Sequence, residues 1–160
     1  MQTAKASQLA DRPERLSLGI KLGFGVGDLG GNLFFTVMGF YLINYLTDSF
    51  GLAAAAAGTA VALGKVWDAV TDPAVGYLSD RTHTRWGRRR PYMAVGAVFL
   101  FLFMILIFTD PGISSSTGRF VWALVVYCLL NTAYTLVNIP YGSLTPELTS
   151  DFDERTTLNG

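Results

Sequence analysis

The sequence predicts an all-α membrane protein with four transmembrane helices, and three observations support this fold class. Apolar residues make up 51% of the chain and charged residues only 15%, against about 25% charged in a typical globular domain. The charges are unevenly spread and leave long apolar stretches, whereas a helix that crosses the bilayer needs about 20 mostly apolar residues. Four such stretches leave too little polar surface for the alternative, a set of core helices in a soluble protein.

The positions of these stretches predict each helix in turn. Charge-free stretches occur at residues 29–46, 91–109 and 120–146. A shorter one at 49–64 spans the membrane only if its helix continues through the charged residues that follow it. We therefore expect transmembrane helices at residues 20–46, 52–79, 91–109 and 119–146. Residues 1–19 are expected to form a tail, and residues 147–160 a tail or the start of a loop to a fifth helix.

Basic residues predict the orientation in the membrane. Lysines and arginines gather in the N-terminal tail and in the loop at 80–90, whereas the connection at 47–51 has none and that at 110–119 has only Arg119. Because cytoplasmic loops are enriched in Lys and Arg, we expect both tails and the 80–90 loop to be cytoplasmic, in the plasma membrane. Topology accounts for the arginines, so they do not indicate nucleic-acid binding. The polar first 16 residues lack the apolar segment of a cleaved signal.

Three ionisable residues in the second expected helix indicate a cation site. Lys65, Asp68 and Asp72 are spaced so that they share one helical face. Each costs about 2.5–3.5 kcal/mol at a helix centre, so this face is expected to line a bundle interior or a water-filled cavity. If all three are ionised, one negative charge remains for Na⁺ or a proton to neutralise. The alternative is an ion pair of Lys65 with one aspartate while the other is protonated.

Polar residues in the fourth and first helices are candidates for contact with a ligand. Asn131, Tyr134, Thr135 and Asn138 form a stripe on one face of the fourth helix, which indicates either a polar cavity wall or interhelical hydrogen bonds. In the first helix, glycines recur every four residues, which is typical of close helix approach. The first helix also contains two polar residues one turn apart that could touch a ligand, Asp28 and Asn32.

The loop after the second helix has the features of a latch rather than of an enzyme site. Asp80 stands at a helix C-terminus, where a negative charge is unfavourable, so we expect a basic partner, either an arginine of the same loop or a neighbouring helix N-terminus. Such a pair could open during a conformational change.

The only histidine, His83, lies in this loop, and the sequence has neither a nucleophile–histidine pair nor a cluster of metal ligands. The protein is therefore not expected to be an enzyme or to need a cofactor.

Several motifs resemble those of a known transporter family. GYLSDR at 76–81 followed by GRRR at 87–90 resembles the loop signature of the major facilitator superfamily, and DRTHTRWGRRRPY at 80–92 resembles that of the glycoside–pentoside–hexuronide:cation symporters, the melibiose permease group. Three further stretches agree: GFGVGDLGGN at 23–32, VWDAVTDP at 66–73, and NIPYGSLTPELT at 138–149, which runs into DERT at 153–156. The resemblance implies a twelve-helix fold in two halves, of which the first four helices are present.

The resemblance also implies a function, namely symport of a sugar or glycoside with Na⁺, H⁺ or Li⁺ by alternating access. The partners would be a small-molecule substrate, the bilayer and the remaining helices of the same transporter. The alternatives are a carrier of a non-sugar organic solute and a non-transporting, truncated membrane protein.

The resemblance assigns roles to individual residues. The cation site would comprise Asp68 and Asp72 with Thr71 and Thr135, and Lys65 would be its charge partner. The residues implied in substrate binding are Asn32, Tyr134 and Asn138, to which we add Asp28. Two of these are amides where melibiose permease has acids, which argues against melibiose itself. The residues implied in the cytoplasmic gate are Asp80, Arg81, Arg88, Arg89 and Arg90.

Overall fold

The computed structural model describes residues 17–85, 87 and 89–143, and its regular elements are all helices. The chain divides into two compact units, residues 1–30 with 143–160, and residues 31–142. The first unit contributes the start of one helix to the described part of the chain. All contacts discussed below lie within the second unit.

The helices correspond in order to the four expected ones, with different ends. Their bounds are α2 Leu18–Phe40, α3 Leu42–Asn44, the π-helical turn η1 Tyr45–Ser49, α4 Ala54–Arg81, α5 Arg90–Ile107 and α6 Ser116–Gly142. The first expected helix is thus interrupted after Phe40, and its end winds into the short α3 and the wider η1, where the Phe50 N–H donates to the Tyr45 carbonyl at 2.8 Å. Residues 144–146 of the fourth expected helix lie outside the described residues.

Three segments are long and apolar enough to cross a membrane, namely Leu22–Ser49, Arg90–Ile107 and Ser116–Gly142. The remaining long helix, α4, has 28 residues but carries three charged side chains near its middle. Its crossing of the membrane therefore stays a prediction. Many outward-facing side chains of α5 are apolar and exposed, among them Val98, Phe101 and Ile105, as expected for a helix surrounded by lipid or by other helices.

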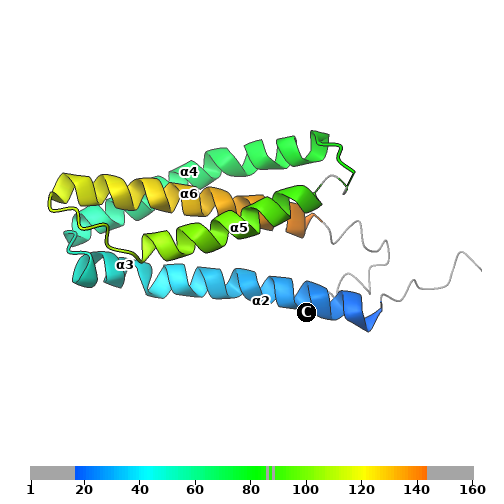
Figure 1. Cartoon of the computed structure of the whole chain (residues 1–160), viewed down its shortest axis with the longest axis horizontal. Coiled ribbons are helices and arrows are strands. Elements are labelled where there is room, and N and C mark those ends of the chain that lie inside the picture. Colours follow the sequence, from blue (N-terminus) through cyan, green and yellow to red (C-terminus); the bar gives the residue numbers. More distant parts are fainter. Residues whose placement is uncertain (1–16, 86, 88, 144–160) are drawn as a thin grey trace, which may run out of the picture. The chain divides into compact units, whose positions relative to one another are not determined.

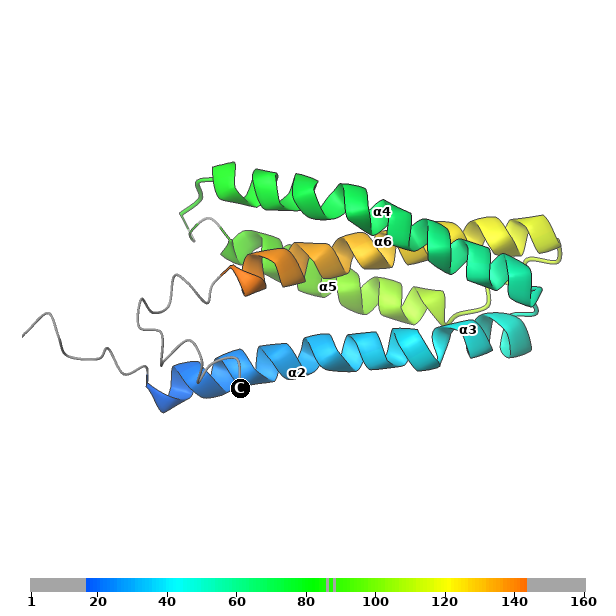
Figure 2. The same cartoon turned by 180° about the vertical axis from the view of Figure 1, so that it is seen from behind.

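Helix α6 lies between α4 and α5 (Figures 1 and 2). On the α4 side, the Trp67 indole N–H donates to Thr132 Oγ1 at 2.9 Å, and Gly76 faces Ile139 a few turns later. Residue numbers thus rise together along both helices, so α4 and α6 run in the same direction. On the α5 side, a Cβ on Gly96 would lie 3.1 Å from the Ala133 carbonyl oxygen, so glycine permits the close approach of α5.

The connection after η1 and the connection after α5 lie at the same end of the bundle (Figure 2), and Arg119 joins them by hydrogen bonds. Arg119 donates from Nε to the Ile113 carbonyl at 2.7 Å and from Nη1 to the Phe50 carbonyl at 3.1 Å. Gly51 has a φ of +74°, and a Cβ there would lie 2.6 Å from Arg119 Nη1. Glycine therefore provides both the left-handed backbone and the room that the guanidinium needs.

Candidate cation and solute site

A cavity of about 170 Å³ lies between the second part of α2, α4 and α6. It brings together residues that are far apart in the sequence, and most of them are polar or aromatic. The described residues that line it are Phe34, Phe35, Lys65, Asp68, Asp72, Asn131, Tyr134, Thr135 and Asn138. The charged face of α4 and the polar stripe of α6 thus meet at one cavity.

Lys65 and Asp68 form an ion pair on α4. Lys65 Nζ lies 3.1 Å from Asp68 Oδ2, and their side chains are 55% and 20% exposed. The Lys65 ammonium also lies 5.8 Å from the centre of the Phe35 ring. The other carboxylate oxygen, Asp68 Oδ1, is buried and accepts no hydrogen bond from the described residues. One aspartate is therefore paired by Lys65, but half of its hydrogen-bonding capacity stays unused.

The second aspartate is held by the neighbouring helix. Thr135 Oγ1 of α6 donates a hydrogen bond to Asp72 Oδ1 at 2.8 Å, and Thr135 is only 3% exposed. A hydroxyl stabilises a carboxylate by hydrogen bonding but brings no positive charge. Among the described lining residues, two carboxylates therefore face one ammonium group, which leaves a formal charge of −1 when all three are ionised.

Aromatic rings form another wall of the cavity. Tyr134 stacks on Phe34 with ring centres 4.3 Å apart and an interplanar angle of 9°. It also meets Phe35 edge to face at 5.2 Å. Asn138, one turn further along α6, lines the cavity and is exposed. Ligand sites typically combine such apolar surfaces with a few polar groups that fix orientation.

Some residues expected in the site lie elsewhere. The Thr71 hydroxyl donates to its own helix, to the Trp67 and Asp68 carbonyls at 3.1 and 3.3 Å, and Thr71 is not among the described residues that line the cavity. Asn32 is exposed on α2 and is likewise not among them. Asp28 belongs to the other compact unit. Their roles stay predictions.

The aromatic residues Phe34 and Phe35 were missed by the sequence analysis. They stand in a long apolar helix, where an aromatic side chain gives no signal that separates a cavity wall from lipid-facing surface. Asn131 was noted in the polar stripe, but its placement was open. The structure buries it to 2% exposure at the cavity.

The loop between α4 and α5 contains the ion pair expected of a latch. Arg89 Nη2 lies 3.1 Å from Asp80 Oδ1. Arg81 instead stacks on Tyr77, with its guanidinium carbon 4.1 Å from the ring centre. Arg90 begins α5, and Arg88 lies outside the described residues. The Asp80 partner is thus an arginine of the same loop.

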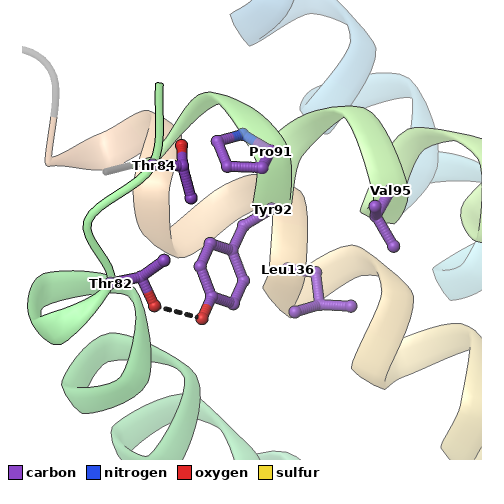
Figure 3. Close-up of a pocket in the computed structure, with 6 residues that line it drawn as sticks. All are labelled: Thr82, Thr84, Pro91, Tyr92, Val95 and Leu136. Atoms are coloured by element: carbon purple, nitrogen blue, oxygen red, sulfur yellow. Dashed lines mark hydrogen bonds between the residues drawn. The ribbon is translucent and has the colours of Figure 1, made fainter. Parts of the chain in front are cut away.

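A second, apolar cavity of about 340 Å³ lies beside this loop. Figure 3 shows the Tyr92 ring between the end of α4 and Leu136 of α6, with its hydroxyl 2.6 Å from Thr82 Oγ1. Val95 and Pro91 line the same cavity. The end of α4 is therefore tied to the start of α5 by a hydroxyl contact as well as by the ion pair.

Residues 23–160 match the MFS/sugar transport protein family. The chain belongs to this family. The match and the names of the relatives confirm the resemblance to cation-coupled glycoside symporters of the major facilitator superfamily. Together with the apolar helices, the match identifies a membrane protein. The family and its named relatives are transporters rather than enzymes.

Three relatives illustrate the range of the family. An uncharacterized symporter of Synechocystis sp. is 42% identical over 91% of this chain. The isoprimeverose transporter of Lactiplantibacillus pentosus is 39% identical over 87% of it, and the sodium-dependent lysophosphatidylcholine symporter 1-A of Danio rerio is 33% identical over 97% of it. This chain spans 28%, 29% and 29% of the length of these relatives.

Proposed function

We propose that the complete protein is a secondary transporter that couples the transport of a sugar or glycoside to the transport of Na⁺ or H⁺ in the same direction, by alternating access. The single observation that carries this proposal is the uncompensated negative charge at the cavity between α4 and α6. A bound monovalent cation restores neutrality there, and carboxylate and hydroxyl oxygens are suitable ligands for it. The candidate ligands are Asp68, Asp72 and Thr135, with Thr71 as a further prediction.

The aromatic and amide wall of the same cavity supports solute binding next to the cation. Tyr134 offers a ring surface, and Asn138 offers both a hydrogen-bond donor and an acceptor. Sugars need this combination, because each ring has apolar C–H faces and a rim of hydroxyl groups. Asn32 and Asp28 of α2 are proposed as additional solute contacts.

The orientation follows from the distribution of basic residues. We place the N-terminus and the loop between α4 and α5 in the cytoplasm, in the plasma membrane. The pair of Asp80 and Arg89, with Arg81, Arg88 and Arg90 beside it, then acts as a latch that opens and re-forms as the transporter changes access. The complete bundle provides the surfaces against which this part moves.

Replacing each aspartate with asparagine tests the proposed cation site. In vesicles containing the complete protein, Asp68→Asn or Asp72→Asn is expected to reduce cation-driven accumulation of a labelled glycoside to the level seen without a cation gradient. Asp48→Asn is a matched control, since Asp48 is an exposed acid in η1 that is not among the described residues lining the cavity. Full gradient-driven uptake in both cavity variants would refute the assignment.

A second candidate function is transport of an amphiphilic, non-sugar solute with the same cation. Two observations favour it: amides occupy the positions where melibiose permease has acids, and one relative is named a lysophosphatidylcholine symporter. The aromatic wall at Phe34 and Phe35 suits an apolar chain as well as a sugar face. Uptake of a panel of labelled sugars and lysophospholipids into the same vesicles separates the two, because only one class should be accumulated by the cation gradient.

A further inference from the structure

Asn131 has an environment that its role in helix packing does not explain. It is 2% exposed on α6 and lines the cavity together with the aspartates of α4. Its side-chain nitrogen Nδ2 is buried and donates no hydrogen bond to the described residues. A buried amide left without a partner destabilises the fold, and an apolar residue of similar shape would avoid that cost.

Asp68 has a matching deficiency on the opposite helix. Its Oδ1 is a buried acceptor that receives no hydrogen bond from the part of the chain that the structure describes. The Asn131 amide packs against α4 one turn before this aspartate, since a Cβ on Gly64 would lie 3.2 Å from Nδ2. An orphaned donor on α6 and an orphaned acceptor on α4 therefore line one cavity of about 170 Å³, which has room for several water molecules at about 30 Å³ each.

We propose that Asn131 is a ligand of the coupling cation and that its carbonyl oxygen makes the site one for Na⁺ rather than for a proton. This inference rests on the proposed cation site. An asparagine side chain carries both a donor and an acceptor, so a rotation of the amide exchanges them. Without the cation, the amide N–H faces the carboxylate of Asp68 through water. With the cation bound, the amide oxygen turns towards it.

The chemistry favours Na⁺ as the ion. Na⁺ is a hard cation that needs several oxygen ligands at once, and a neutral carbonyl adds a ligand without adding another negative charge to the cavity. A proton needs only one carboxylate, and an amide oxygen can add no more than a single hydrogen bond to the protonated group. Asn131 lies one turn from Thr135, which already bonds to Asp72, so both residues of α6 reach the α4 carboxylates from the same side.

The complete, purified protein allows a direct test in which NaCl is the probe. Its thermal unfolding is followed as NaCl replaces choline chloride at constant ionic strength, and the midpoint of the Na⁺-dependent stabilisation is measured. Asn131→Leu is expected to raise that midpoint about tenfold or more, as is typical when a group that supports a metal ligand set is removed. Without Na⁺, the same variant should melt no lower than the native protein, because leucine removes an unpaired buried amide.

A conservative variant separates a ligand from a packing residue. Asn131→Asp keeps an oxygen at the same position, so at about pH 8, where an ordinary aspartate is ionised, its midpoint should stay within about threefold of the native one. A purely structural role would lower the melting temperature of Asn131→Leu and leave the Na⁺ midpoint where it was. Should Asn131→Leu fail to accumulate in membranes, Asn131→Ala carries the same test.

The outcomes distinguish this inference from the proposed function. An unchanged midpoint in Asn131→Leu, or an equal rise in the leucine and aspartate variants, overturns the role of Asn131. If Asp68→Asn has abolished the Na⁺ response in the same experiment, the proposed cation site still stands. No Na⁺ response in the native protein overturns the preference for Na⁺, while proton-driven uptake would still support symport. A full Na⁺ response in Asp68→Asn would refute the cation site itself.

Discussion

A single methyl group at Gly64 is expected to disturb the packing of α4 against α6. Gly64 is buried, and a Cβ there would overlap Cδ1 and Cε1 of the Tyr127 ring, whereas carbon atoms pack at about 3.5–4.0 Å. The ring has little room to move, since Tyr127 is 3% exposed within the main hydrophobic cluster. Gly64→Ala must therefore push the two helices apart by about 1 Å or more.

The magnitude follows from two opposing effects. Overpacking of this kind costs about 1–3 kcal/mol, and alanine regains up to about 1 kcal/mol of helix propensity relative to glycine. We expect Gly64→Ala to lower the free energy of unfolding by up to about 2 kcal/mol. The bond from Thr135 to Asp72 is 2.8 Å long, so a rigid separation of about 1 Å would carry it beyond hydrogen-bonding distance. Cation-driven uptake should therefore fall along with stability.

Gly58 on the same helix provides the matched control. A Cβ at this position would meet no described atom within 4 Å, so Gly58→Ala should gain helix propensity without overlap and leave stability unchanged or raised. The measurement is the thermal midpoint of the complete protein in detergent, with vesicle uptake in parallel. A Gly64→Ala protein that melts at or above Gly58→Ala would contradict this prediction, because the close approach at Gly64 would then have no energetic consequence.

Two further predictions concern the ends of the helices. Arg119→Gln should destabilise the protein by about 2–4 kcal/mol, because charged hydrogen bonds to two carbonyls are lost. Chemical unfolding measures this loss of stability, with Arg85→Gln at an exposed arginine as the control. Equal unfolding midpoints for the two variants would contradict the prediction. Asp80→Asn should cost less than about 1 kcal/mol, since Asp80 is 60% exposed in its pair with Arg89. If the pair is a latch, that change should nevertheless speed maleimide labelling of a Thr84→Cys variant, and an unchanged rate would contradict the latch.

The helical period made part of the site predictable from the sequence. Charges three and four residues apart must share a helix face, and a charged face must avoid lipid, so the clustering of Lys65, Asp68 and Asp72 at a cavity follows from spacing alone. The stripe on α6 was recognisable for the same reason. The hydrogen bond between Asp72 and Thr135 then required only that these two faces meet.

Other features depend on how each helix is rotated and where it ends, which spacing does not determine. Phe34 and Phe35 line the cavity but are indistinguishable in sequence from the apolar residues around them. Thr71 is adjacent to Asp72 in sequence, yet a one-residue step rotates the side chain by about 100° around the helix, and its hydroxyl bonds to its own helix instead. The sequence also has no proline near Phe40 from which the interruption of α2 could have been predicted.

The placement of two consecutive residues on α6 suggests how the proposed cation and solute sites are coupled. Thr135 bonds to Asp72, and its neighbour Tyr134 stacks on Phe34 at the aromatic wall. Because both belong to one helical turn, a shift of Thr135 that accompanies cation binding must also move the ring of Tyr134. Thermodynamic linkage requires the reverse as well: a solute that fixes Tyr134 raises cation affinity by the factor by which the cation raises solute affinity. The proposed cation and solute sites therefore share one turn of α6, so no longer path through the bundle is needed to couple them.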